Sequence, residues 1–234
     1  MLGLAFTGVA LRANILVVGD PPMLGTGNCD PFGCPGFLGL STYQQVYLSS
    51  AFPSSISIVG LTFYEGQVHN GGQPAGGSYT LSFSYTTFAP GSLDLTNPNN
   101  NISSSSENFF SGALPTLTPE GGGNFLVISG TPFVYNPADG NLLLTVTVTG
   151  GTNSGTPLFL NESVCGPQTI CPQGSSVVTG NAYFGNANGG NDIGGLVTGF
   201  DYSTSPTTPE PGTLISALAG FGLIAYRRRR GKAA

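Results

Sequence analysis

The stretch Ser78-Tyr-Thr-Leu-Ser-Phe-Ser-Tyr-Thr-Thr87 decides the fold class of this chain of 234 residues. Its aromatic and aliphatic residues stand at every second position, with serines and threonines between them. Because successive side chains of a strand point to opposite faces of a sheet, this alternation is typical of a half-buried β-strand. We expect the buried face to consist of Tyr79, Leu81, Phe83 and Tyr85.

The same alternation returns elsewhere in the chain. It predicts a strand over 56–64, with Val59, Leu61 and Phe63 on one face. It predicts a second strand over 141–149, whose inward residues are Leu142, Leu144, Val146 and Val148. The remaining strand candidates are 14–19, 42–49, 107–113, 124–130, 132–135, 156–160, 176–184 and 196–202.

Clusters of Gly, Pro, Asn and Ser separate these segments, for example at 71–77 and 97–101. No stretch of this body has a sustained apolar period of 3.6 residues. Many short alternating strands between turn signals favour an all-β fold. We therefore predict an antiparallel β-sandwich or jelly-roll-like body over 14–202. We expect the Ser/Asn-rich tract 95–108 to be a long mobile loop.

The charge distribution restricts the partners of this body. Charged residues make up only 7% of the chain, against about 25% in a typical domain. The six basic residues lie at positions 12, 227–230 and 232, and the interval 13–226 holds all eleven carboxylates and no Lys or Arg. Since binding to phosphate groups needs cations, we expect no nucleic-acid partner and no binding of the body to anionic membrane surfaces.

The C-terminal end has three parts in order. The triplet Pro209-Glu210-Pro211 precedes an apolar run over 212–226. Four cations follow this run, namely Arg227, Arg228, Arg229 and Arg230. The run has 15 residues and would span roughly 22 Å as a helix. This is shorter than the ~20 residues that a helix usually needs to cross a bilayer. The cations are typical of a membrane stop-transfer signal, so we predict a short transmembrane helix, with a buried core helix as the competing interpretation.

This order over 209–230 resembles the PEP-CTERM sorting signal of Gram-negative bacteria. The resemblance implies that the protein is exported, transiently anchored in the inner membrane, and processed near the triplet by an exosortase-type membrane protease. It implies a final location in the cell envelope, at the cell surface or in the extracellular matrix, with exopolysaccharide as a candidate partner. Residues 203–208 would then be a linker and 231–234 a short tail. A plain C-terminal anchor is the competing interpretation.

The segment 1–13 resembles the end of a secretory signal peptide, with an apolar stretch and a cleavage position after Ala13. It lacks a basic first region, and Arg12 is unusual so close to a cleavage site. We therefore expect the true start to lie upstream of Met1. The competing interpretation is that 2–11 forms a first core strand.

Four cysteines form two local pairs, Cys29 with Cys34 and Cys165 with Cys171. An even number of cysteines in an exported chain favours disulfides, and these two short loops are the simplest of the three connectivities. A zinc site is the alternative, which the spacings fit poorly without a nearby histidine.

Candidate catalytic residues are few. His69 is the only histidine and stands beside a Gly-rich turn, with no G-x-S-x-G motif to complete a triad. The glutamates considered for a glycosidase pair are Glu65, Glu107, Glu120 and Glu162, and nothing in the sequence brings two of them together. We therefore expect no enzymatic activity.

Calcium is the one cofactor that the sequence suggests. The turns 136–141 and 185–192 offer Asp139 and Asp192 as weak candidate ligands, although neither turn fits the EF-hand pattern. Ordinary turns are the simpler interpretation, so we expect no cofactor.

Three function classes remain. We favour a non-enzymatic protein of the cell surface or matrix. A carbohydrate-binding β-sandwich module is the alternative, and it would have a row of exposed tyrosines on one sheet face or a calcium site in a loop. A secreted glycoside hydrolase would instead have two facing carboxylates roughly 5 to 9 Å apart.

Overall fold

The computed structural model describes residues 14–19, 27–35, 41–66, 71–120, 123–152, 155–164, 179–184, 191–192 and 194–204. The chain divides into two units, 1–204 and 205–234, and every described residue belongs to the first. Within these ranges no helix is both long and apolar enough to cross a membrane. The helix predicted over 212–226 lies outside the described residues, as do 1–13.

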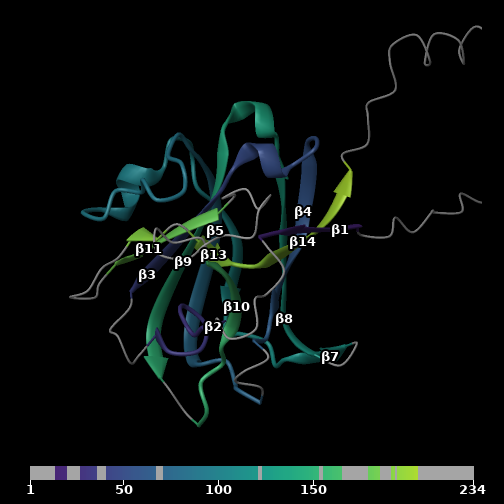
Figure 1. The fold of residues 1–234 in the computed structure, drawn as a ribbon, viewed down its shortest axis with the longest axis vertical. Coiled ribbons are helices and arrows are strands. Elements are labelled where there is room, and N and C mark those ends of the chain that lie inside the picture. The colour runs from purple at the N-terminus through teal and green to yellow at the C-terminus, as the bar shows by residue number, and fades with distance from the viewer. Residues whose placement is uncertain are drawn as a thin grey trace, which may run out of the picture. The chain divides into compact units, whose positions relative to one another are not determined.

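The described part of the chain consists of antiparallel sheets with a few short 3-10 turns (Figure 1). A five-stranded sheet has the order β1 (Asn14–Val18), β14 (Thr198–Thr204), β4 (Ile56–Tyr64), β8 (Gly123–Tyr135), β7 (Thr118–Glu120). A six-stranded sheet has the order β12 (Asn191–Asp192), β11 (Thr179–Phe184), β3 (Thr42–Tyr47), β9 (Asn141–Thr152), β5 (Gly76–Thr86), β6 (Glu107–Gly112). A small sheet joins β13 (Gly194–Leu196), β10 (Leu160–Val164), β2 (Gly27–Asn28). The 3-10 turns are η1 (Ser49–Ala51), η3 (Pro98–Asn101), η4 (Pro137–Asp139).

Aromatic side chains from the two larger sheets pack against each other in a shared core. Phe83 of β5 stacks on Phe133 of β8 with ring centroids 5.2 Å apart. Tyr47 of β3 meets Phe200 of β14 edge to face at 5.0 Å. Each fully buried side chain of this size contributes roughly 1.5–3 kcal/mol to folding. The predicted antiparallel, sandwich-like arrangement is therefore confirmed.

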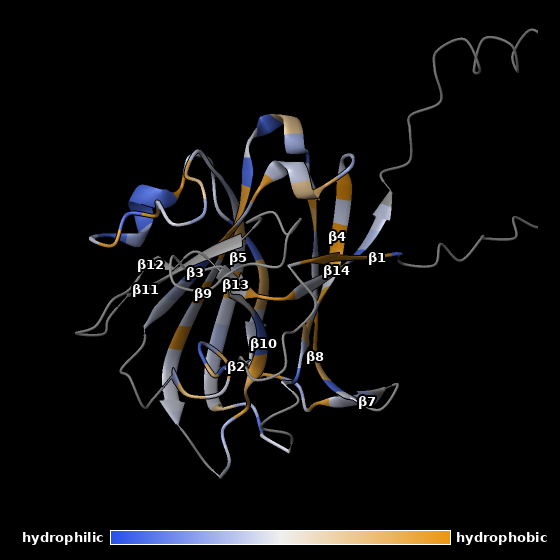
Figure 2. Ribbon diagram, in the orientation of Figure 1, coloured by the Kyte–Doolittle hydropathy of each residue, from blue (hydrophilic) through white to orange (hydrophobic). Residues whose placement is uncertain are grey.

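The period of two predicted the inward residues of β5 and β9 correctly. Along β5, Tyr79, Leu81 and Phe83 are buried and Tyr85 is half-buried against the core. The four inward residues predicted for β9 are buried as well. Figure 2 shows apolar and polar residues alternating along β9, as expected for a strand with one face on a core.

The prediction for β4 was wrong at Val59, which is half-buried. The buried apolar residues of this strand are Ile56, Ile58, Leu61 and Phe63. In the pairing of β4 with β14, Gly60 pairs with Asp201 and Ile58 with the next residue, Tyr202, so Val59 is an extra residue in a bulge. A bulge reverses the inward and outward alternation beyond it, which lets apolar residues on both sides of Val59 face the core.

Several strand boundaries also differ from the sequence prediction; the strand predicted over 156–160, for example, is β10, which begins only at Leu160 and continues to Val164. The segments 124–130 and 132–135 form the single strand β8, with Pro132 in the irregular stretch opposite Val59, where its missing N–H costs no ladder bond. The predicted strand 196–202 divides at Val197, where the chain leaves the small sheet and enters the five-stranded sheet. Its second part, β14, continues to Thr204, which extends into the segment predicted as a linker.

The Ser/Asn-rich tract predicted to be mobile is instead held to the outer face of the six-stranded sheet. Asn101 is 1% exposed and donates from Nδ2 to Gln44 Oε1 (2.8 Å) and to the Asp94 carbonyl (2.9 Å). Gln44 donates in turn to the Pro98 carbonyl at 3.0 Å. Beneath the tract lies a second small apolar cluster, which consists of Val46, Leu93 and Leu143 with Phe88 and Ile102 at its border.

The side-chain amide of Gln45 holds the point where β13 passes into β14. Gln45 is fully buried, donates from Nε2 to the Leu196 carbonyl (2.8 Å) and accepts from the Leu196 N–H (2.9 Å). It therefore pairs with Leu196 as a neighbouring strand residue would. Tyr43 donates to the same amide oxygen, and the Thr198 hydroxyl links Leu196 to the Tyr47 hydroxyl. This network connects the six-stranded sheet to the chain segment that enters the five-stranded sheet.

Replacement of Gln45 by Ala should lower the free energy of unfolding by about 2–4 kcal/mol, because it removes the acceptor of a buried N–H and leaves a cavity. Urea unfolding followed by circular dichroism measures this difference. Asn99→Ala, at an exposed position, is the control and should change stability by under about 0.5 kcal/mol. Equal, small effects of both substitutions would contradict the role given to Gln45.

Candidate functional site

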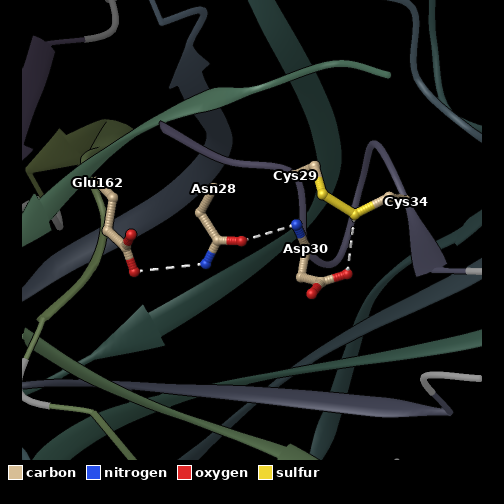
Figure 3. The surroundings of a disulfide bond; sticks show 5 residues. All are labelled: Asn28, Cys29, Asp30, Cys34 and Glu162. Atoms are coloured by element: carbon tan, nitrogen blue, oxygen red, sulfur yellow. Dashed lines mark hydrogen bonds between the residues drawn. A yellow bond between two sulfur atoms is a disulfide. The ribbon is translucent and has the colours of Figure 1, made fainter. Parts of the chain in front are cut away.

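A disulfide joins Cys29 and Cys34, whose Cα atoms are 5.3 Å apart (Figure 3). The first of the two predicted pairings is therefore confirmed. Cys165 and Cys171 lie outside the described residues, so their pairing stays a prediction.

Packing and backbone hydrogen bonds shape the loop that this disulfide closes. The Phe32 ring is fully buried, with its centroid 4.9 Å from that of Phe63. A side chain at Gly33 would place its Cβ 1.9 Å from the Leu158 carbonyl oxygen, so only glycine fits there. The Cys29 carbonyl accepts hydrogen bonds from the N–H groups of Gly33 and Cys34. The core thus holds the loop by contacts other than the disulfide.

Asp30 places a buried carboxyl group against the disulfide. The residue is 5% exposed, and its Oδ1 lies 3.4 Å from Cys34 Sγ (Figure 3). A disulfide sulfur carries no proton, so this contact is a hydrogen bond only when the carboxyl group is protonated and donates to sulfur. The Asp30 N–H donates to Asn28 Oδ1 at 2.9 Å, which fixes the start of the loop.

A second carboxylate is linked to Asp30 through Asn28. Asn28 Nδ2 donates to Glu162 Oε1 at 3.3 Å, across 134 positions of sequence (Figure 3). Burial raises the pKa of Asp30 from 3.8 to about 6, and the negative charge of Glu162 adds to the increase. We call Asn28, Cys29, Asp30, Cys34 and Glu162 the disulfide cluster.

The ligand atoms of Cys29, Asp30 and Cys34 lie within 4.8 Å of one another, a spacing that a metal ion would fit. Both sulfurs are joined in the disulfide, however, whereas zinc requires thiolates. The oxidised cluster therefore does not provide the zinc site considered as an alternative.

The outward side of the five-stranded sheet carries a second group of polar and aromatic residues. Tyr64 and Phe125 meet edge to face with centroids 5.4 Å apart. Thr62 donates to Asp201 Oδ2 at 3.5 Å, and burial raises the pKa of Asp201. A Cβ at Gly60 would lie 2.6 Å from the same oxygen, so the glycine makes room for this carboxylate. We call Thr62, Tyr64, Phe125 and Asp201 the outer-face patch.

Three of the four glutamates proposed for a glycosidase pair have described side chains: Glu65 follows β4, Glu107 is in β6 and Glu162 is in β10. Glu65 accepts from the N–H of Gly71 (2.7 Å) and from Asn124 Nδ2 (2.6 Å), so it holds a turn. Glu107 is exposed at the first residue of β6, and Glu162 belongs to the disulfide cluster. The side chain of Glu120 lies outside the described residues.

The other predicted site residues are either in ordinary contacts or not described. Asp139 is exposed in η4 and accepts from Asn136 Nδ2 at 3.0 Å, as in many turns. The Asp192 side chain and His69 lie outside the described residues, as do 209–211 and 227–230. None of the tyrosines with a described side chain is exposed, so this part of the chain lacks the predicted tyrosine row; these residues are Tyr43, Tyr47, Tyr64, Tyr79, Tyr85, Tyr135 and Tyr202.

Sequence reasoning did not identify Asp30 as a site residue. The available signal was a carboxylate inside a short cysteine loop, next to Cys29. Its link to Glu162 depends on the pairing of β2 with β10 and was not visible in the sequence.

The family model of the PEP-CTERM protein-sorting motif matches residues 207–230. The match covers the triplet, the apolar run and the four arginines, and it confirms the resemblance described above. The motif indicates an exported protein of the bacterial envelope that is sorted through its C-terminal signal. No curated protein and no solved structure matched the chain.

Replacement of Asp30 by Asn should stabilise the protein above pH 6. The folded-state pKa is raised, so the folded protein favours the protonated carboxyl group, and stability falls as pH rises from 3.8 to about 6. The neutral amide avoids this cost, and we expect a gain of roughly 1–3 kcal/mol at pH 8 that disappears below pH ~4. Urea unfolding at both pH values measures it, with Glu107→Gln as the exposed control. A destabilised variant at pH 8 would contradict the pKa assigned to Asp30.

Proposed function

We propose that this chain is a non-enzymatic protein that is delivered to the cell surface or extracellular matrix of a Gram-negative bacterium. The match of the sorting motif at 207–230 is the observation that carries this proposal. The disulfide Cys29–Cys34 supports it, because disulfides persist in the oxidising compartments outside the cytoplasm. The interval 13–226 contains no Lys or Arg, so the body lacks the side chains that bind nucleic acids and other phosphate-rich partners inside the cell. This composition is consistent with a location outside the cell.

The C-terminal signal acts in two steps in this proposal. The apolar run 212–226 enters the inner membrane, and Arg227 to Arg230 stop its transfer and keep the end of the chain on the cytoplasmic side. An exosortase-type protease then cuts near Pro209-Glu210-Pro211 and releases the body from this anchor. The order of the three parts and the family match support this sequence of events.

Substitution of Glu210 by Ala should block processing in a host that has an exosortase-type protease. An epitope placed after Ala234 should disappear from the wild-type protein and remain on Glu210→Ala, since the motif is the recognition element. Immunoblots of membrane and medium fractions with this epitope and with an antibody to the body measure the two pieces. Glu107→Ala, in the body, is the matched control and should be processed like the wild type. Retention of the epitope on the wild type would contradict processing.

Binding to exopolysaccharide is a second candidate function, and the outer-face patch is the observation that favours it. A half-buried aromatic pair beside a carboxylate and a hydroxyl offers both ring contacts and hydrogen bonds to a neutral sugar chain. The absence of Lys and Arg between 13 and 226 suits a neutral rather than an anionic polymer.

Removal of the aromatic ring by Tyr64→Ala should then weaken binding to exopolysaccharide from the native host about fivefold, since a ring contact of this kind is worth on the order of 1 kcal/mol. Affinity electrophoresis in gels containing the polysaccharide measures the change. Thr147→Ala, exposed on the six-stranded sheet, is the control. Unretarded migration of the wild type would remove this candidate.

A further inference from the structure

We propose that Asp30 accepts the proton of the Cys34 thiol when the Cys29–Cys34 disulfide forms, and returns it when the disulfide is reduced. The inference rests on the contact between Asp30 Oδ1 and Cys34 Sγ at 3.4 Å and on the burial of both residues, 5% and 4% exposed. It is independent of the proposed function, because it concerns the chemistry of this cluster and not the fate of the C-terminus.

The burial of this carboxyl group needs an explanation that an ion pair does not provide. Removing a carboxylate from water is costly unless a cation or several hydrogen bonds compensate it. No Lys or Arg exists between 13 and 226, and the charged group that faces Asp30 in the described part of the chain is Glu162, which has the same sign. Asp30 is therefore held against the sulfur at a cost to stability.

The two cysteines differ in access, which assigns their roles. Cys29 is half-buried and Cys34 is buried, so an external disulfide reaches Cys29 first. A small-molecule disulfide, RSSR, exchanges with Cys29 and leaves a mixed disulfide and one RSH. The Cys34 sulfur then attacks the Cys29 sulfur, and the bond between Cys29 and the second RS group breaks.

Asp30 acts in the proton transfer that accompanies this second exchange. As the Cys34 sulfur attacks, its proton passes to the Asp30 carboxylate, which later gives it to the departing RS⁻ or to water. Two protein thiols are thus oxidised to one disulfide, and RSSR is reduced to two RSH. A thiol has an ordinary pKa of about 8.5, and the raised pKa of Asp30, about 6, brings the base closer to it.

The loop is preformed for this reaction. Phe32 is fixed in the core and Gly33 lies against the Leu158 backbone, so these contacts do not require the disulfide. They keep the two sulfurs close in the reduced protein, which makes closure effectively unimolecular. The Asn28 side chain connects Asp30 to Glu162 and fixes the carboxyl-bearing loop.

If Asp30 acted only through its negative charge, its effect on the rate of disulfide closure would have the opposite sign. A negative charge beside a thiol disfavours the thiolate, so a carboxylate that acts only by charge slows closure, and its removal accelerates it. A carboxylate that takes the proton speeds closure, and its removal slows it. The direction of the change therefore separates the two roles.

The experiment follows oxidation of the fully reduced full-length chain by glutathione disulfide at pH 7. Remaining thiols are trapped with N-ethylmaleimide, and pepsin peptides are analysed by mass spectrometry, because the body offers no site to trypsin. Asp30→Asn should slow closure of Cys29–Cys34 about tenfold or more. The reactions of Cys165 and Cys171 in the same sample are the internal control and should not change. Asp30→Glu should restore part of the rate, and Glu162→Gln should retain most of it.

An unchanged or faster closure of Cys29–Cys34 in Asp30→Asn would overturn the proposal. A second measurement starts from the folded, oxidised protein and does not depend on folding of the reduced chain. A water-soluble phosphine attacks the Cys29 sulfur and releases the Cys34 thiolate, which takes a proton from Asp30; water then converts the thiophosphonium to phosphine oxide and the Cys29 thiol. The wild type should be reduced faster than Asp30→Asn, with the largest rate ratio below pH ~6, where Asp30 carries the proton. A ratio of one from pH 5 to 8 would overturn the proposal as well.

Discussion

The arrangement of the sheets depends on the buried amide of Gln45. This side chain pairs with both backbone groups of Leu196 and stands where the chain passes from the small sheet into the five-stranded sheet. The Thr198 hydroxyl extends the network to Tyr47, whose ring packs on Phe200 across the core. A buried amide costs stability unless all its hydrogen bonds are made, so the network specifies one way of placing β14 on the six-stranded sheet. The edge strand β1 then pairs with β14.

The same core that this network organises also holds the disulfide cluster. Phe32 fills a position beside Phe63 of the five-stranded sheet and faces Tyr79 of the six-stranded sheet. The short cysteine loop is therefore part of the packing between the sheets. The burial of its carboxyl group, Asp30, lowers stability and so needs another explanation. The proposed proton transfer with Cys34 gives the loop a chemical role in addition to its structural one.

The sequence predicted those features that depend on local pattern. Period-two alternation identified the buried faces of β5 and β9, and cysteine spacing identified the disulfide at Cys29 and Cys34. Features that depend on pairing between distant strands were not predictable. Val59 lies in a bulge that only the register of β4 with β14 defines, and Asn101 is fixed by Gln44, 57 positions away. Asp30 became a site residue only once β2 paired with β10 and brought Glu162 near it. The C-terminal signal could be identified because its three parts are adjacent in sequence.

The central claim is that an oxidised β-sheet body is exported and then separated from a C-terminal membrane signal. The intact mass of the protein recovered from native envelope and matrix fractions tests this claim most directly. The account predicts a species that begins near Asn14 or later, ends near Pro209, and is lighter by two hydrogens for each of its two disulfides, Cys29–Cys34 and the predicted Cys165–Cys171. A species that still carries Arg227 to Arg230 would contradict it, because the C-terminal segment would then be a permanent part of the mature protein.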